Sequence, residues 1–202
     1  ELSNKITPSD NRESNGYSSN KATQYAKQWW NRTNNTDFPY YANYYKQDLN
    51  SNDYNDLDEN AEGQSAIRRG WSDCTNFVSQ ILEASGVAQV VYDSVHSGWW
   101  HKRVPGFLGI GWTHTHSRSW TIADTFARYM GITYSTKNHP SFSSNIQRGD
   151  FIAADFTSDG NWDHSGFVTD RASSSYAHNG SPSYYDYKVA QHTSDYHAWT
   201  SS

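Results

Sequence analysis

Residues 73–80 read Asp73-Cys74-Thr75-Asn76-Phe77-Val78-Ser79-Gln80 and contain the only cysteine of the 202-residue chain. From this cysteine onward, small or apolar residues recur at the spacing of one helix face: Cys74, Phe77, Val78, Ile81, Leu82 and Ser85. Ser72 or Asp73 is a suitable N-cap for such a helix, and Gly86 is a suitable stop. The segment therefore predicts a helix that turns one face toward the core.

Cys74 lies in the first turn of this predicted helix. Unpaired backbone N–H groups and the positive end of the helix dipole favour an anion there, so they favour thiolate over thiol. Such a setting is typical of a nucleophilic cysteine. The alternative is a small buried thiol that only packs, because free cysteine is among the most buried residue types. Position alone leaves both interpretations open.

The composition indicates one domain with a core built largely from aromatic rings, since 202 residues include 9 Trp and 15 Tyr. The net charge of −5 gives no basic patch for nucleic acid. No apolar run approaches the roughly 20 residues of a membrane span. One cysteine excludes an internal disulfide and a multi-cysteine zinc site. A polar chain with one thiol, beginning at Glu1, suits a mature exported bacterial protein or an excised domain.

The N-terminal part divides into a leader and a helix. Residues 1–19 are polar and aperiodic, so we expect a flexible leader there and a folded domain over residues 20–202. Residues 20–30 have apolar side chains at helical spacing. We expect Trp29 and Trp30 in the core, with carbohydrate stacking as the alternative role.

Two segments carry partial metal-binding patterns. The acidic stretch 48–59 places oxygen-bearing residues at several positions of a calcium-binding loop, but Asp53 stands where that loop needs glycine. We expect a solvated acidic loop, with calcium binding as the alternative. His114 and His116 form an H-x-H pair without a third ligand at a recognisable spacing. No metal site is therefore assigned.

The segment after the cysteine helix mixes short apolar runs with glycine-rich loops. Residues 87–118 are expected to form strand fragments and loops that face a substrate, and residues 119–131 a helix capped by Ser119 and ended by Gly131. Tryptophans in these loops suit a binding groove or, equally, core packing. The candidate substrate-binding residues are Asp73, Trp99, Trp100 and Trp112.

Short strands dominate the C-terminal part. The expected strands cover residues 151–154, 164–169, 174–177 and 185–192, separated by turns rich in Gly, Ser and Asp. Helices followed by a run of short strands predict an α+β domain, with N-terminal helices packed on a C-terminal antiparallel sheet.

A cysteine nucleophile needs a base, and the base needs a group that orients it. If the helix bearing Cys74 packs on the later sheet, a histidine that opens a strand can face the helix N-terminus. His164 has that position after a polar turn. His192 and Asn179 are the candidates for the orienting group, on or near neighbouring strands.

Several segments closely resemble a bacterial family known as the putative amidase domain, over roughly Asn20 to Tyr196. They are the helix from Tyr25 to Asn31, the block Asp73 to Gln80, Ser119-Trp120, Gly149-Asp150 and Asp163 to Thr169. That family resembles the NlpC-type and CHAP cell-wall hydrolases within the papain-like fold. The resemblance implies a papain-like fold for this chain as well.

The resemblance also implies roles for individual residues. Cys74 would be the nucleophile and His164 the base, and the third polar group of NlpC-type enzymes favours His192 over Asn179. The backbone N–H of Cys74 would hold the oxyanion, with Gln64 as a candidate second donor.

The implied function is hydrolysis of an amide bond in bacterial peptidoglycan, either the muramoyl–alanine bond or one in the stem peptide. We expect no cofactor, a monomer, and a secreted or wall-associated location. One alternative is a non-catalytic wall- or glycan-binding module on the same fold. Another is an acyltransferase that passes the acyl group to an amine.

Overall fold

The computed structural model describes residues 2–6, 16–32, 37–38, 73–177, 179–192 and 195–201; for residues 2–6, Trp112 and Thr113 it describes the backbone alone. Its elements in chain order are β1 (Leu2–Ile6), α1 (Ser19–Trp29), α4 (Cys74–Ala84), β2 (His101–Pro105), η2 (Phe107–Gly109), β3 (Trp112–His116), α5 (Arg118–Thr121), α6 (Ala123–Met130), β4 (Tyr134–Thr136), α7 (His139–Asn145), β5 (Phe151–Asp155), β6 (His164–Tyr176), β7 (Tyr184–Gln191) and β8 (Tyr196–Trp199). The acidic stretch 48–59 and Gln64 lie outside the described residues, so their expected roles stay predictions.

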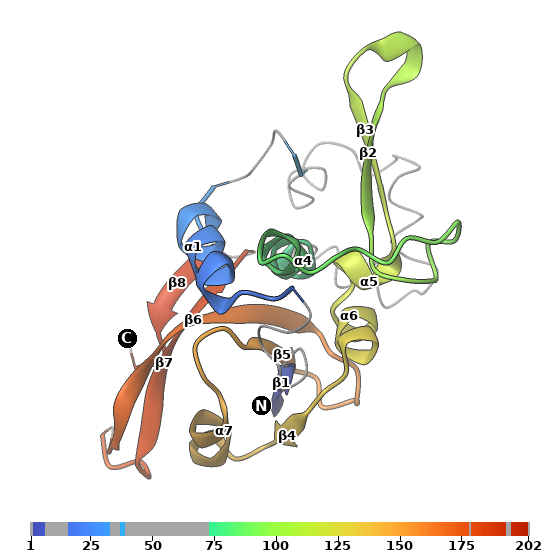
Figure 1. Ribbon diagram of the computed structural model, residues 1–202. Coiled ribbons are helices and arrows are strands. Elements are labelled where there is room, and N and C mark those ends of the chain that lie inside the picture. Colours follow the sequence, from blue (N-terminus) through green and yellow to red (C-terminus); the bar gives the residue numbers. More distant parts are fainter. Residues whose placement is uncertain are drawn as a thin grey trace.

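A six-stranded antiparallel sheet, in the order β4-β1-β5-β6-β7-β8, organises the described part of the chain. Helices α1, α4 and α6 pack on one face and α7 on the other (Figure 1). The period-two alternation of a strand separates the two cores along β6. Phe167 packs with α4, whereas its neighbour Val168 packs with Phe142 and Ile146 at α7. The predicted α+β class with an antiparallel sheet is confirmed.

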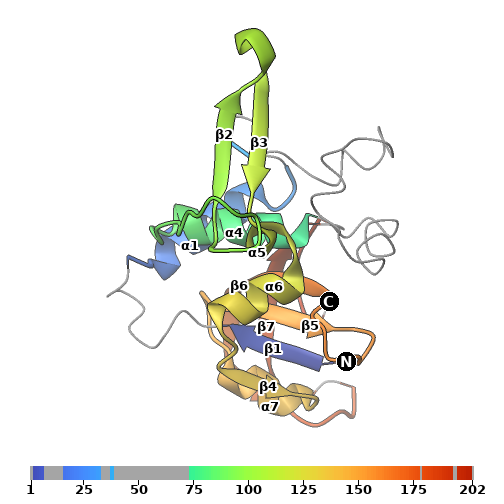
Figure 2. The ribbon, with the colours of Figure 1, turned by 90° about the vertical axis from the view of Figure 1, so that its right-hand side faces the viewer.

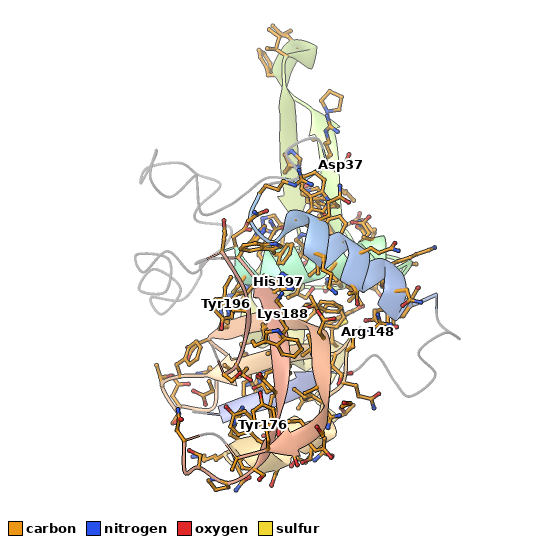
Figure 3. The ribbon with its side chains drawn as sticks, turned by 90° about the vertical axis from the view of Figure 1, so that its left-hand side faces the viewer. Asp37, Arg148, Tyr176, Lys188, Tyr196 and His197 are labelled. Atoms are coloured by element: carbon orange, nitrogen blue, oxygen red, sulfur yellow. The ribbon has the colours of Figure 1, made fainter. Side chains whose placement is uncertain are left out.

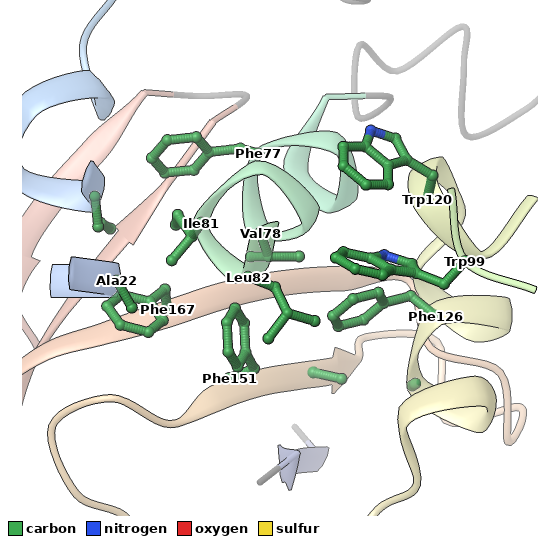
Figure 4. Close-up of a cluster of buried hydrophobic side chains, with 14 of the residues drawn as sticks. Ala22, Phe77, Val78, Ile81, Leu82, Trp99, Trp120, Phe126, Phe151 and Phe167 are labelled. Atoms are coloured by element: carbon green, nitrogen blue, oxygen red, sulfur yellow. The ribbon is translucent and has the colours of Figure 1, made fainter. Parts of the chain in front are cut away.

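Helix α4 packs on the sheet between α1 and α5, and all of its residues from Cys74 to Leu82 are buried. Its apolar side chains pack on Phe151 and Phe167 of the sheet, as the sequence periodicity predicts (Figure 4). The opposite side is buried as well, because the Ser79 hydroxyl is hydrogen-bonded to both Trp99 and Trp120. The helix is therefore held from several sides at once.

Helix α4 ends at Ala84 with Ser85 as its C-cap, and Gly86 follows as predicted. Gly86 has a φ of +106°, and a Cβ atom there would lie 2.4 Å from the carbonyl oxygen of Gly16. The Ser18 N–H donates a 2.9 Å hydrogen bond to the Ser85 carbonyl oxygen beside this contact. The turn after α4 therefore fixes the chain where it enters α1.

The first strand lies within the segment that the sequence predicts to be a flexible leader. Residues Leu2–Ile6 form β1, paired with both β4 and β5. Tyr17, also in that segment, is buried and packs with the ring of Phe151. Five mostly polar residues give too short a pattern for periodicity to identify the strand. The domain division at residue 20 stays a prediction.

Two other elements differ from their predicted extents. The helix expected over residues 119–131 is divided into α5 and α6, because Ile122 has extended backbone angles of φ −106° and ψ 122°. The two strands expected at residues 164–169 and 174–177 form one strand, β6. Two register shifts against β7 allow β6 to continue through this stretch.

A separate two-stranded hairpin, β2–β3, projects from the helical side of the molecule (Figure 2). It accounts for much of the stretch from residue 87 to 118, where short strands and loops are predicted. Its base is held by Trp100, whose backbone N–H donates a 3.0 Å hydrogen bond to the Ser117 hydroxyl. No helix among the described residues is long and apolar enough to span a bilayer.

Candidate active site

Cys74 is the first residue of α4, and its thiol is almost fully buried. Helix α4 packs on β6 at this point, where the hydroxyl oxygens of Thr75 and Ser165 lie 2.9 Å apart in a hydrogen bond. This bond joins the residue after Cys74 to the residue after His164. It therefore brings the thiol and the imidazole together where the helix and the strand both begin.

The imidazole of His164 has two partners. Its Nε2 lies 2.8 Å from Oε1 of Gln191. An amide oxygen only accepts hydrogen bonds, so Nε2 carries a proton and donates it to Gln191. Nδ1 is then the nitrogen left for the hydrogen bond that His164 makes with Cys74. In the neutral ring, Nδ1 has a lone pair that can accept the thiol proton.

The thiol and the imidazole shift each other's pKa. Burial raises the pKa of Cys74, but the charge and hydrogen bond of His164 outweigh it and lower the pKa to about 7. Burial lowers the pKa of His164, but the Cys74 charge and the hydrogen bonds of Cys74 and Gln191 raise it above its ordinary value. Both net shifts favour a thiolate beside an imidazolium, and such a coupled pair titrates as one unit.

The structure places Gln191 beside His164, where we expect His192 from the sequence. His192 lies apart from that imidazole, with its ring stacked on Phe77 at a centroid distance of 3.8 Å. The other candidate, Asn179, is exposed in the turn after β6, whereas His164 is the first residue of that strand. Gln191 thus holds the orienting position.

Strand register explains why Gln191 and not its neighbour meets His164. Val168 pairs with Val189 in the β6–β7 ladder. Alternation then places His164 on the same face as Val168, and Gln191 on the same face as Val189. His192 falls on the opposite face, where it stacks on Phe77 of α4. His164 is the first residue of β6, and its contact with α4 is with the first residue of that helix, Cys74. The alternation is visible in the sequence, but the pairing that aligns the two strands is not.

His192 instead belongs to a buried polar network that holds the start of α4. Its Nδ1 lies 2.5 Å from Oδ2 of Asp73, and its Nε2 donates to the Trp29 carbonyl oxygen at 2.8 Å. The other Asp73 oxygen accepts from Asn76 Nδ2 at 2.9 Å, and Asn76 Oδ1 accepts from Trp120 Nε1 at 2.9 Å. Asp73 is therefore hydrogen-bonded inside the protein, and its expected role in substrate binding stays a prediction.

The charge state of His192 follows from its partners. Burial lowers its pKa, but the hydrogen bond and charge of Asp73 outweigh burial and raise it above the ordinary value. With a carboxylate on one side and a carbonyl oxygen on the other, both ring nitrogens donate in the charged form. His192 and Asp73 then form a buried ion pair in which both ring N–H groups of His192 have an acceptor. Asp73 directly precedes Cys74 in the sequence.

The tryptophans expected to line a substrate groove are placed differently. Trp99 and Trp100 are buried, with 1 % and 4 % of their surface exposed. Trp99 stacks on Trp120 at 4.9 Å between ring centroids and donates to Ser79 Oγ at 3.0 Å. Core packing is therefore the role that the structure gives them. The side chain of Trp112 lies outside the described part.

The histidines of the hairpin contact one another. His101 Nε2 lies 2.9 Å from His114 Nδ1, and burial together with the charges of His114 and His116 lowers the pKa of His101 to about 3. Within the described residues, no group of three or more His, Cys, Asp or Glu side chains is arranged to hold a metal ion. These histidines are better described as packing groups, since His101 also stacks on Trp120.

One aromatic residue beside the site has no signal in the sequence. Phe156 stacks on the His164 ring at 6.0 Å between centroids and is half exposed. Its backbone N–H donates to Oδ2 of Asp163, which fixes the turn before β6. The side chain therefore lies beside His164 and is partly open to solvent. Only the strand pairing of β5 with β6 places it there.

Comparisons with known proteins identify the family of this chain. The family model described as the putative amidase domain matches residues 16–202. A relative, the uncharacterized protein YhbB of Bacillus subtilis (strain 168), is 27 % identical over 147 residues. That alignment covers 73 % of this chain but 35 % of YhbB, so the chain spans about a third of the relative's length. No solved structure gives a significant match. By the match over residues 16–202, the chain belongs to the putative amidase domain family.

Proposed function

We propose that this domain is a cysteine-dependent amidase or peptidase. Cys74 is the nucleophile, His164 is the general base and acid, and Gln191 orients the His164 ring. The observation that carries the proposal is the junction of α4 and β6, where Thr75 and Ser165 are hydrogen-bonded beside Cys74 and His164, and Nε2 of His164 lies 2.8 Å from Oε1 of Gln191. A thiol whose pKa lies near 7 at the N-terminus of a helix supports it, because a large share is then thiolate at neutral pH.

The proposed reaction has two acyl-transfer steps. In the first, the Cys74 thiolate attacks the amide carbonyl carbon, and the imidazolium of His164 gives its Nδ1 proton to the leaving amine. In the second, His164 takes a proton from water, which attacks the thioester and releases the acid and the thiol. The charge on the carbonyl oxygen develops at the positive end of α4, where we assign the Cys74 backbone N–H as a donor.

The proposed substrate is an amide bond of bacterial peptidoglycan, at the muramoyl–alanine junction or within the stem peptide. Its support is the resemblance of the segments around Cys74 and His164 to the putative amidase domain family, which itself resembles the NlpC-type and CHAP cell-wall hydrolases of the papain-like fold. A secreted or wall-associated location is part of the same proposal. The family description supports an amidase in the general sense.

Purified cell wall tests the proposal. Wild-type protein is expected to reduce wall turbidity and release new amino termini, identified by mass spectrometry as free alanine amines or as stem-peptide ends. Cys74→Ala and Cys74→Ser are expected to abolish both signals while thermal unfolding stays cooperative. Ser181→Ala, in an exposed turn, is the matched control and retains activity. Unchanged lysis by Cys74→Ala refutes the proposal, and wall binding without any released amine favours the non-catalytic module.

A further inference from the structure

The tip of the β2–β3 hairpin carries three large apolar side chains with little cover. Phe107, Leu108 and Ile110 are 88 %, 80 % and 79 % exposed. Phe107 and Leu108 lie in the short turn η2, and Ile110 directly follows it, at the end of the molecule's projecting arm (Figure 2). Contiguous exposed apolar side chains on a protruding element mark an interaction site, because isolated ones are common but clusters are not.

A backbone hydrogen bond closes the turn at the tip. The Gly106 N–H donates to the Gly111 carbonyl oxygen at 3.1 Å, which closes the turn at its base. A Cβ atom on Gly106 would lie 2.2 Å from the Ile110 carbonyl oxygen, so the close approach requires glycine. The turn therefore holds the apolar side chains outward, in a fixed arrangement.

The charged residues of the hairpin's own sequence are basic. Residues 94–123 include Lys102, Arg103 and Arg118 and contain no Asp or Glu, although the whole chain has 21 acidic and 16 basic residues. Lys102 is exposed on the hairpin stem, with its ammonium 5.0 Å from the Trp100 ring centroid. Arg103 makes a 3.8 Å ion pair with Asp37 at the stem (Figure 3). Arg103 is thus already paired, which leaves Lys102 as the hairpin cation that can face an anionic apolar surface below the apolar tip.

The area at the tip favours a bilayer over a protein partner. Three side chains offer a few hundred Å², whereas a stable protein interface needs roughly 800 Å² on each side. A convex tip also needs no matching groove to enter the region between lipid headgroups and acyl chains. Trp112 pairs with Pro105 in the register, which places an aromatic residue on the strand next to the tip.

We propose that the β2–β3 hairpin docks this domain on an anionic lipid bilayer, by inserting Phe107, Leu108 and Ile110 while Lys102 faces the headgroups. The hairpin base joins the side of α4 through Trp99 and Ser79, so docking leaves the Cys74 end of α4 outside the bilayer surface. This inference does not depend on the proposed hydrolysis, because a protein without the thiol is expected to dock equally well.

Sedimentation with vesicles tests the docking directly. Wild-type protein and Cys74→Ala are expected to bind vesicles of phosphatidylcholine with phosphatidylglycerol, and to bind phosphatidylcholine alone more weakly. The triple variant Phe107→Ser, Leu108→Ser, Ile110→Ser is expected to lose about tenfold or more in partitioning, with unchanged thermal unfolding. Val91→Ser removes an exposed apolar side chain outside the tip and is the control with wild-type binding.

A single-cysteine label locates the contact. In the Cys74→Ala background, Leu108→Cys carries an environment-sensitive fluorophore, and its emission is expected to shift to the blue on vesicle addition. The same label at Ser181→Cys, in an exposed turn between β6 and β7, is expected not to shift. Absence of wild-type sedimentation, or equal sedimentation of the triple variant, overturns the proposal. So does a wild-type dimer that the triple variant dissociates without any vesicle binding, because the tip would then contact another copy of the chain.

Discussion

Replacing Gln191 with leucine tests the orienting role most selectively, because the change removes one acceptor and keeps a side chain of similar size. A hydrogen bond to a charged group contributes about 1.5–3 kcal/mol, and the lower figure applies because Gln191 is only half buried. About 1.4 kcal/mol corresponds to one pH unit in a pKa. Since a less stable imidazolium supports the thiolate less well, we expect the pKa of Cys74 to rise by about one pH unit.

Alkylation by iodoacetamide measures this shift at a single site, because Cys74 is the only cysteine in the chain. With a wild-type pKa near 7, about half of the thiol is ionised at neutral pH, and one pH unit reduces that to about a tenth. The alkylation rate at neutral pH is therefore expected to fall about fivefold in Gln191→Leu. Well above both pKa values, the two proteins are expected to react at similar rates.

Gln28→Leu is the matched control, since it makes the same change at an exposed position of α1. It is expected to keep the wild-type profile. A wild-type alkylation profile for Gln191→Leu would refute the orienting role. If His192→Asn were folded and raised the pKa of Cys74 instead, the orienting role would return to His192.

Two further changes test the buried residues around the site. His192→Asn leaves the Asp73 carboxylate buried without its cation and is expected to lower the free energy of unfolding by about 3 kcal/mol or more in chemical denaturation. Burial lowers the pKa of His192, but Asp73 outweighs burial, so the pKa in the folded protein lies above the ordinary value. The ion pair therefore stabilises the fold fully below the ordinary histidine pKa, and this contribution is lost as pH rises through the pKa of the folded state. The stability gap between the two proteins should therefore narrow with rising pH, and a widening gap would contradict the ion pair. Trp99→Phe removes the hydrogen bond to Ser79 and is expected to cost about 1–3 kcal/mol of stability without changing Cys74 alkylation, whereas slower wall hydrolysis at unchanged stability would restore a substrate role.

Local patterns in the sequence predict the cysteine helix, its end at Gly86 and the strand that begins at His164. Helical spacing and the backbone freedom of glycine depend on neighbours a few residues away. The structure has the helix, its end and the strand where the sequence predicts them. The fold class follows from the same local signals, because helices precede a run of short strands. Local signals do not predict the strand at Leu2–Ile6, because that strand is defined by its pairing with two strands far away in the sequence.

The identity of the orienting residue depends on long-range register. Gln191 and His192 are adjacent, and either is a plausible partner for a histidine when only the sequence is known. The pairing of Val168 with Val189 decides between them, because a shift of one residue would exchange their faces. The burial of Trp99 and Trp100 is similarly non-local, as it depends on how the hairpin base packs on α4.

The pH profile of Cys74 alkylation, in wild-type protein and in His164→Ala, tests the activation of the thiol most directly. It needs no knowledge of the substrate, and near-ultraviolet circular dichroism checks that the variant stays folded. We expect a wild-type midpoint of about 7. We expect a midpoint above the ordinary thiol value in His164→Ala, because burial then raises the pKa without the opposing charge. A common midpoint for both proteins, at or above the ordinary thiol value, would contradict the assignment of His164 as the partner of a nucleophilic Cys74.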